Sequence, residues 1–145
     1  MHLPKHFFNL LLLFFFLVTT ACSDDSGQNP TDHRLLGKWN VLSKTKTETF
    51  PGEAPEVEKE GYDAGEKTYT FTADGKLVIV DGHGNHSTTL PAWMDGDKLF
   101  IGQNHPNKQP YTVTIEGQRA LLVKEETTTK DGRTLLKIEE VLLER

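Results

Sequence analysis

The side chains of this sequence that could take part in chemistry lie at two places. Cys22 is the only cysteine, and it follows an apolar run and three small residues. A lone thiol can accept a lipid or react with an oxidant, but it cannot form a disulfide within the chain. Three of the six histidines, His83, His86 and His105, lie in or beside expected loops, where imidazole nitrogens could bind zinc or nickel.

The surrounding pattern favours neither a metal site nor an enzyme. No His-Glu-x-x-His or Cys-His arrangement accompanies the loop histidines, so we predict no bound metal and no cofactor. The sequence has no nucleophile elbow, and four of the nine aspartates directly precede glycines in expected turns, where their backbone role explains them. We therefore expect no catalytic residues. The net charge of −5 also argues against nucleic-acid binding, which needs clustered Lys and Arg.

Residues 1–21 are predicted to be a signal peptide. Lys5 precedes an apolar run, Leu10–Val18, that is too short to span a bilayer stably. Ordinary cleavage after Ala21 would leave a free thiol on the mature chain. Modification of Cys22 by lipid is the alternative that we favour, because an exposed thiol is reactive in an oxidising envelope.

The sequence Thr-Thr-Ala-Cys that ends at Cys22 resembles the lipobox of bacterial lipoproteins, although Thr19 stands where that family usually has Leu. The resemblance implies a diacylglyceryl group on the thiol and attachment to the outer membrane. Ser23-Asp24-Asp25 resembles the acidic signal that sends some Gram-negative lipoproteins to the cell surface; a plain linker is the alternative. Residues 22–31 then form a flexible tether, and the protein is periplasmic or on the cell surface.

Residues 32–145 are predicted to form one all-β domain. Apolar and polar residues alternate there, and Asp-Gly turns such as Asp74-Gly75 separate the alternating runs. The expected strands lie at about 38–50, 68–72, 77–80, 86–94, 99–102, 111–116, around 121–123, and 135–143. Eight strands joined by consecutive hairpins favour an antiparallel up-and-down barrel, because closure removes the exposed edges.

Two details of the strand pattern are less regular. Pro91 lies inside the fourth strand, and this suggests an edge or a bulge there. The spacing of apolar residues in the last strand changes phase, which predicts a β-bulge near Glu139 or Glu140.

Three segments resemble lipocalins. Leu35-Leu36-Gly37-Lys38-Trp39 resembles the Gly-x-Trp element that opens the first lipocalin strand. Tyr69–Lys76 and Tyr111–Glu144 are similar to the second and the closing hairpins of bacterial lipocalin-like lipoproteins. The resemblance implies a lipocalin-like barrel in which Trp39 plugs the closed end. Asp32 can cap a short N-terminal helical turn that Gly37 ends.

A small apolar or amphipathic ligand inside the barrel is the leading functional hypothesis. The residues expected to point inward, as cavity lining or as core packing, are Val41, Tyr69, Phe71, Tyr111, Val113, Leu121 and Val123. The competing hypothesis is a protein-interaction module that inhibits, protects against or scaffolds another protein. In that hypothesis the acidic segment Pro51–Glu66 meets a basic partner.

The connections predict which residues share an end of the barrel. Alternate hairpins of an up-and-down barrel lie at the same end. The end with the longer loops should hold His83, His105 and Glu58, and the other end should hold Asp74, Asp95 and Gly117. We expect Pro51–Glu66 to be a solvated loop at the first end, or a lid over the mouth that packs through Val57 and Tyr62.

Overall fold

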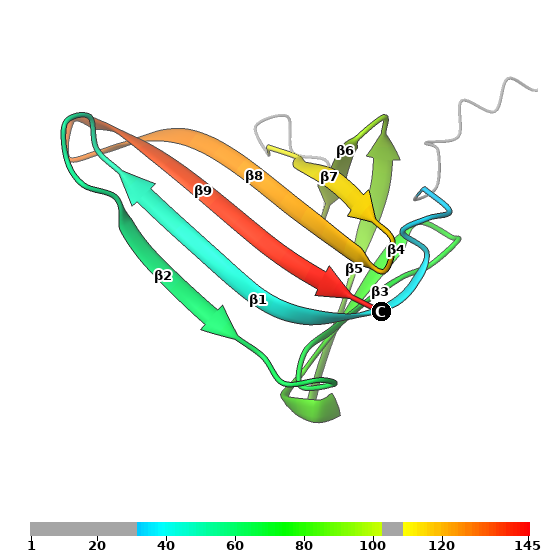
Figure 1. The fold of residues 1–145 in the computed structure, drawn as a ribbon. Coiled ribbons are helices and arrows are strands. Elements are labelled where there is room, and N and C mark those ends of the chain that lie inside the picture. The colour runs from blue at the N-terminus through cyan, green and yellow to red at the C-terminus, as the bar shows by residue number, and fades with distance from the viewer. Residues whose placement is uncertain (1–31, 103–108) are drawn as a thin grey trace, which may run out of the picture.

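The computed structural model describes residues 32–102 and 109–145, which form an all-β domain (Figure 1). Asp-Gly turns and alternating apolar residues give nine strands and one 3₁₀ turn. The elements are β1 (Gly37–Thr49), β2 (Glu56–Gly61), β3 (Thr68–Phe71), β4 (Lys76–Asp81), η1 (Gly82–Gly84), β5 (His86–Asp95), β6 (Lys98–Ile101), β7 (Tyr111–Glu116), β8 (Arg119–Lys130) and β9 (Arg133–Glu144).

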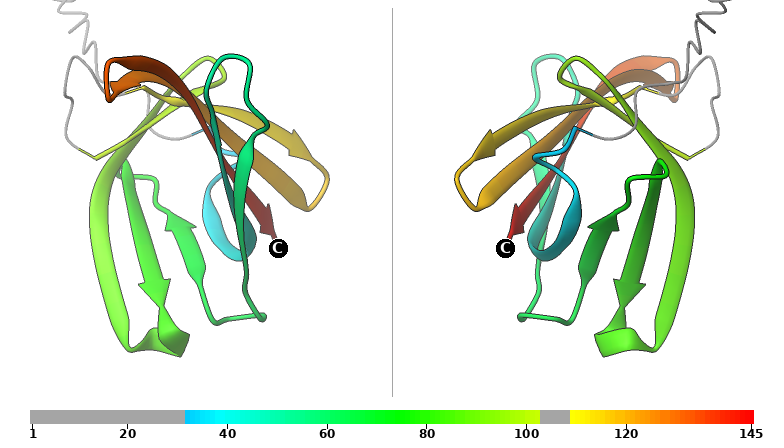
Figure 2. Two further views of the ribbon diagram at one scale, coloured as in Figure 1. Left: turned by 90° about the vertical axis from the view of Figure 1, so that its left-hand side faces the viewer. Right: turned by 90° about the vertical axis from the view of Figure 1, so that its right-hand side faces the viewer.

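Eight of these strands close into an antiparallel up-and-down barrel, as predicted. Each strand from β3 to β8 pairs with the next in sequence, and β1 pairs with both β3 and β9, which completes the circle. The expected eight strands correspond to β1 and β3–β9. In Figure 2 the green strands β3, β4 and β5 form one wall, and the orange and red strands β8 and β9 lie across from them. The weakest seam joins β6 and β7 through two residue pairs.

The ninth strand corrects the expectation for Pro51–Glu66. Residues 56–61 form β2, which pairs antiparallel with the far half of β1, from Ser43 to Glu48. β3 has four residues and covers β1 only as far as Asn40, so the far half of β1 has a free edge that β2 can occupy. The segment is therefore partly a strand. Val57 is 58 % exposed, whereas Tyr62 packs against the core.

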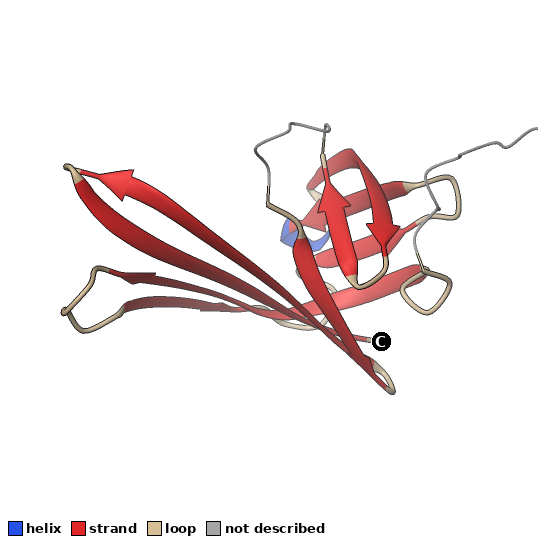
Figure 3. Cartoon of the chain, turned by 90° about the horizontal axis from the view of Figure 1, so that it is seen from above, coloured by secondary structure: helices blue, strands red, loops and turns tan. Residues whose placement is uncertain are grey.

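The long strands extend beyond the barrel as a four-stranded arm in the order β2-β1-β9-β8 (Figures 1 and 3). We define the arm as residues 43–49, 56–61, 124–130 and 133–140. β7 pairs with β8 only as far as Val123, so residues 124–130 also continue past their barrel neighbour. One face of the arm is continuous with the interior of the barrel.

A β-bulge in β1 reverses which side chains face inward. The pairing of β1 with β9 shifts between Val41 and Ser43, opposite Leu143 and Leu142. A one-residue slip moves every later side chain to the other face of the sheet, so Lys44 points into the barrel. The bulge predicted in β9 is wrong, because β9 pairs with β8 without a break.

The other irregularity also has a different explanation from the one predicted. β5 is not an edge strand, since it lies between β4 and β6. Pro91 sits where the pairing with β4 ends and the pairing with β6 begins. A residue without an N–H is tolerated at such a boundary.

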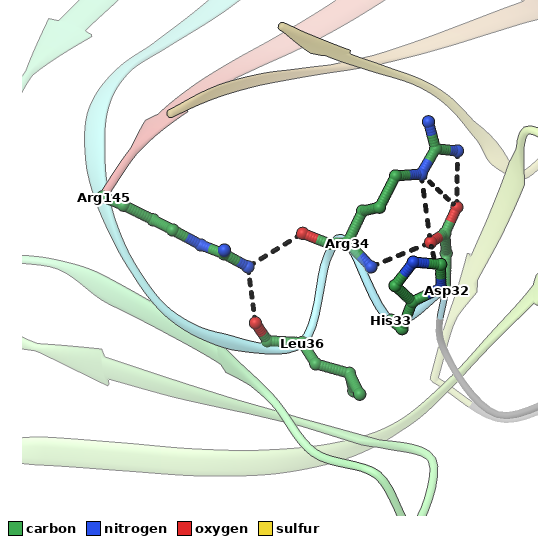
Figure 4. A network of polar contacts seen from close by, with 5 residues as sticks. All are labelled: Asp32, His33, Arg34, Leu36 and Arg145. Atoms are coloured by element: carbon green, nitrogen blue, oxygen red, sulfur yellow. Dashed lines mark hydrogen bonds and ion pairs between the residues drawn. The ribbon is translucent and has the colours of Figure 1, made fainter. Parts of the chain in front are cut away.

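Large side chains fill one end of the barrel. Trp39 and Leu35 are fully buried, and the Trp39 indole nitrogen donates to the Leu35 carbonyl oxygen at 2.7 Å. Arg145 stacks on the Trp39 ring at 4.1 Å and donates to the carbonyl oxygens of Arg34 and Leu36 (Figure 4). In place of the expected helical turn there is a single turn, closed by the hydrogen bond from the Leu35 N–H to the Asp32 carbonyl oxygen at 2.8 Å. The Asp32 carboxylate accepts the Arg34 N–H at 2.9 Å and so caps this turn. Trp39 therefore occupies the closed end, as predicted.

Consecutive antiparallel pairing confirms the predicted arrangement of the ends for the residues that the structure describes. The turns that contain Asp74, Asp95 and Gly117 lie at the Trp39 end, and η1 with His83 lies at the opposite, open end. Glu58 lies beyond the open end, in β2 of the arm. His105 falls outside the described residues.

Candidate functional site

The open half of the barrel contains a pocket of about 240 Å³, a little below the usual range of small-molecule sites. Every one of the eight barrel strands contributes at least one lining residue. The lining residues are Lys44, Tyr69, Leu77, Ile79, Leu90, Ile101, Tyr111, Leu122, Lys124, Glu139 and Val141. A cavity enclosed by all strands lies inside the barrel, not on its surface.

Polarity changes along the pocket from the closed end outward. The pairing of β9 with β1 gives the order of the inward-facing residues. Leu143 pairs with Val41 near the closed end, and Val141 pairs with Lys44. Glu139 is the next inward-facing residue of β9 toward the open end. Leu77 and Leu122 are fully buried and belong to the apolar core. The deep part of the pocket is therefore apolar, and its outer wall is charged.

The charged wall consists of two lysines that share one carboxylate. Glu139 of β9 lies 2.9 Å from the ammonium nitrogen of Lys124 and 3.7 Å from that of Lys44. All three side chains are 22 % exposed, so solvent screens these charges less than it screens a surface pair. Tyr111 donates its hydroxyl hydrogen to Glu139 Oε1 at 2.8 Å, and Lys124 lies 4.9 Å from the centre of the Tyr111 ring.

The pKa shifts describe the protonation state of this wall. Burial by itself raises the pKa of Glu139, but contacts with Lys124 and Tyr111 and the charge of Lys44 outweigh it, and the pKa lies below its ordinary value. Burial, the charge of Glu139 and the hydrogen bond to it raise the pKa of Tyr111. Glu139 is therefore ionised and Tyr111 neutral near neutral pH, so Lys44, Lys124 and Glu139 together carry one net positive charge.

Tyr69 places a second phenol in the pocket. Its ring meets Phe71 edge to face at 6.5 Å, and burial raises its pKa to about 12. Its hydroxyl makes no hydrogen bond to any residue within 32–102 and 109–145. A neutral phenol beside a cavity can donate to a bound molecule or to water.

A second hollow of about 270 Å³ continues from the pocket along the arm. It shares Lys124 and Glu139 with the barrel pocket. Its remaining lining residues are Lys46, Thr47, Glu48, Glu126, Lys137 and Ile138. Oppositely charged neighbours alternate here, as between Lys137 and Glu48 at 3.5 Å. The arm thus extends the site with a hollow whose lining residues are mostly charged.

The structure divides the seven predicted cavity residues into three groups. Tyr69 and Tyr111 line the pocket. Val41, Phe71 and Val113 point inward but belong to the core or pack against it. The inward orientation predicted for Leu121 and Val123 is wrong: their neighbours Ala120 and Leu122 are buried and face the core. Leu121 pairs with Leu142 and Val123 with Glu140 on the outer face.

Sequence reasoning missed the charged wall. The run Ala120-Leu121-Leu122-Val123 is apolar throughout, so alternation could not tell which face is internal. Lys124 lies two residues after Leu122 and therefore on the same face of β8, and this spacing could have indicated that Lys124 points inward. No sequence signal indicates that Lys44 points inward, because its orientation depends on the bulge in β1.

The histidines within the described ranges, His33, His83 and His86, do not line this pocket. His83 lies in η1 with a left-handed backbone (φ 56°), and both His83 and His86 are exposed. Within the described ranges, no three His, Cys, Asp or Glu residues are close enough to hold a metal ion. Cys22 lies outside the described residues, as does the whole predicted signal and tether. Across 32–102 and 109–145, no helix is both long and apolar enough to cross a membrane.

Comparison with known proteins adds little to this description. No protein family and no curated protein matches the chain. A similar solved structure is a protein of unknown function from the DUF3598 family of Nostoc punctiforme, with a TM-score of 0.33 and 14 % identity. The match covers 80 % of this chain and 50 % of that chain, so the chain spans about half the length of this relative. A likeness this distant carries no argument about function.

Proposed function

We propose that this chain is a lipid-anchored binding protein of the bacterial cell envelope and holds a small amphipathic molecule in its barrel. The observation that carries the proposal is the pocket lined by all eight barrel strands, with an apolar interior and a charged outer wall. Small barrels often fill their interior with side chains, so a cavity that remains open needs a reason. The proposed activity is binding, without a chemical step.

The location rests on the sequence. A signal peptide over residues 1–21 and a lipid on Cys22 would anchor the barrel to the outer membrane through the tether 22–31. Two or more acyl chains, at about 0.8 kcal/mol per buried methylene, hold a protein stably on a membrane. The barrel would then face the periplasm or the cell surface.

Ligand binding is tested by blocking the pocket. Leu90→Trp places a large side chain in the cavity, and Leu121→Trp makes the same kind of change on the outer face as a matched control. Extraction of the protein purified from its native host should release a hydrophobic molecule. The Leu90→Trp protein should lose this molecule, and Leu121→Trp should retain it. Absence of any such molecule, together with no binding of octanol by the unaltered protein, would refute the proposal.

The anchor is tested by mass spectrometry of the mature N-terminus. The expected result is a diacylglyceryl group on Cys22, and an unmodified thiol would rule out the lipoprotein. Protease treatment of intact cells then distinguishes the two faces, since a periplasmic protein stays protected and a surface protein is cleaved.

A second candidate function is protein binding through β2. All six residues of β2 are exposed, and within the described ranges β2 pairs only on the side that faces β1. An unpaired strand edge can accept a strand from another protein. Glu56, Glu58 and Glu60 favour a basic partner over an acidic one.

Replacing Val57 with Pro would test the second candidate by removing a backbone donor from β2. Loss of a co-purified protein from the Val57→Pro variant, with an intact barrel ligand, would support the partner. An unchanged set of co-purified proteins would argue against a role for β2.

A further inference from the structure

We infer that the barrel pocket selects a molecule with an anionic head group, which Lys44 and Lys124 bind at the outer wall while a short apolar tail enters the barrel. This inference rests on the proposed function and names the class of ligand.

The first argument is the charge of the wall. Two lysines from β1 and β8 approach one carboxylate, that of Glu139, and leave one positive charge without a counterion in a partly buried place. Charges removed from water are costly unless they are paired. An anion in the pocket would supply the missing negative charge.

The second argument is the balance of hydrogen-bond donors and acceptors. Glu139 already accepts from Tyr111 and lies against Lys124. The Lys44 ammonium lies 3.7 Å from Glu139, which is longer than a hydrogen bond, and no other residue in the described ranges accepts from it. A lysine has three donors and no acceptor. The wall therefore offers donors, and it would serve a carboxylate, sulfate or phosphate oxygen better than a cation.

Other acids near the mouth compensate this charge only weakly. Glu60 stands across from Lys44 in the register of β2 and the charge of Lys44 lowers its pKa, but the hydrogen bond from the Tyr62 hydroxyl is the larger cause of that shift and the charge of Lys46 also exceeds that of Lys44 in its effect. Glu58 pairs with Lys46 at 3.8 Å, further out on the arm. Both glutamates belong to an exposed strand, where water screens their effect on the pocket.

The third argument is the size and lining of the inner pocket. Leu77, Ile79, Leu90 and Ile101 supply apolar side chains from β4, β5 and β6, across from the lysines. A volume of about 240 Å³ corresponds to roughly eight water-sized groups at about 30 Å³ each. A molecule with a six- to ten-carbon tail and a single anionic group fits this description.

The test compares three probes of one length that differ in head group. Calorimetry of the purified protein with octanoate, octanol and octylammonium should give the tightest binding for octanoate and the weakest for octylammonium. Equal affinities for octanoate and octanol would overturn the inference and leave the proposed function standing. Failure of all three probes to bind would overturn the inference, and together with the absence of a co-purified hydrophobic molecule it would also overturn the proposed function.

Substitutions then assign the preference to the wall. Lys44→Met and Lys124→Met should each weaken octanoate binding about tenfold and leave octanol binding unchanged. Lys38→Met, at an exposed position of β1, is the matched control and should change neither. Glu139→Gln removes the competing carboxylate and should tighten octanoate binding severalfold. A loss of octanoate affinity in Glu139→Gln would contradict the inference, because a merely structural role predicts that direction.

Discussion

Glu139 sets the electrostatic balance of the pocket. Its carboxylate lies against Lys124, Lys44 and the Tyr111 hydroxyl, which come from three other strands. A partly buried carboxylate with several donors is stabilised in its ionised form even though burial opposes ionisation. The same contacts also link β1, β7, β8 and β9, so this side chain contributes to stability as well as to the site.

Glu139→Gln should make the stability of the protein less dependent on pH. The pKa of Glu139 is lower in the folded protein than in the unfolded chain. The ionised side chain therefore contributes fully to the free energy of unfolding above the pKa of an unfolded glutamate, about 4.3. This contribution is lost as the pH falls through the pKa of the folded protein. Urea denaturation at pH 7 should show a loss of about 1–2 kcal/mol in the variant, and this difference should narrow below pH 4.

Glu140→Gln is the control for this experiment, because Glu140 lies on the outer face beside Thr45 and Val123. It should change stability by less than about 0.5 kcal/mol. A constant difference between wild type and Glu139→Gln at every pH would contradict the assigned role.

Arg145→Ala should destabilise the closed end by about 1–3 kcal/mol. The substitution removes the guanidinium from the Trp39 ring and leaves the carbonyl oxygens of Arg34 and Leu36 without their donor. Arg145→Lys should recover only part of the loss, since an ammonium lacks the planar fork. Urea denaturation measures both. Arg119→Ala, which breaks an exposed pair with Glu144, is the control and should cost less than about 1 kcal/mol.

At the scale of elements, β1 connects the two parts of the molecule. Its first four residues pair with β3 in the barrel, and residues 43–48 pair with β2 in the arm. β9 pairs with β1 over most of their length and with β8 over twelve residue pairs. Within the described residues, β2 is paired only along the edge that faces β1. The ion pair between Arg133 and Glu53 joins the loop between β1 and β2 to the β8–β9 hairpin.

Hydrogen exchange should follow this difference in pairing. The amides of β8 and β9 that bond across the long ladder should be the most protected, because both strands are paired along most of their length. The amides of β2 should exchange fastest among the strands, and those at the two-pair β6–β7 seam should be intermediate. Mass spectrometry of peptides from these strands gives the measurement. Protection of β2 equal to that of β9 would show that β2 has a further partner.

At the scale of the molecule, the tightly packed core and the binding pocket lie at opposite ends of the barrel. The Trp39 end is filled by Leu35, Val41 and Leu143, all fully buried. The opposite end keeps the pocket, and the arm extends from it. Binding can therefore vary at one end without disturbing the packing at the other.

The domain should unfold in a single transition. β1 and β9 run through both barrel and arm, so neither part can lose its ladder without the other losing a neighbour. Fluorescence of Trp39 and Trp93 and far-ultraviolet circular dichroism should give the same urea midpoint. An earlier transition in circular dichroism would mean that the arm unfolds separately from the barrel.

Much of this architecture was predictable because it depends on local signals. Turns such as Asp74-Gly75 have a left-handed glycine, φ +75° at Gly75, whatever the rest of the chain does. Alternation in β3 and β7 identified Tyr69 and Tyr111 as inward-facing, and both line the pocket. Between such turns, β-branched and aromatic residues specified eight strands, and consecutive hairpins then fixed which turns share an end.

The tertiary structure decided what local patterns leave open. The bulge after Val41 exists in the pairing of β1 with β9, and without that pairing nothing in β1 turns Lys44 inward. The pairing of β8 with β7 and β9 decides which of its side chains face inward, because the apolar run in β8 has no alternation of apolar and polar residues. β2 forms because short β3 leaves an edge of β1 free. The sequence by itself thus determined the eight barrel strands and their order, while long-range pairing determined β2 and which side chains meet in the pocket.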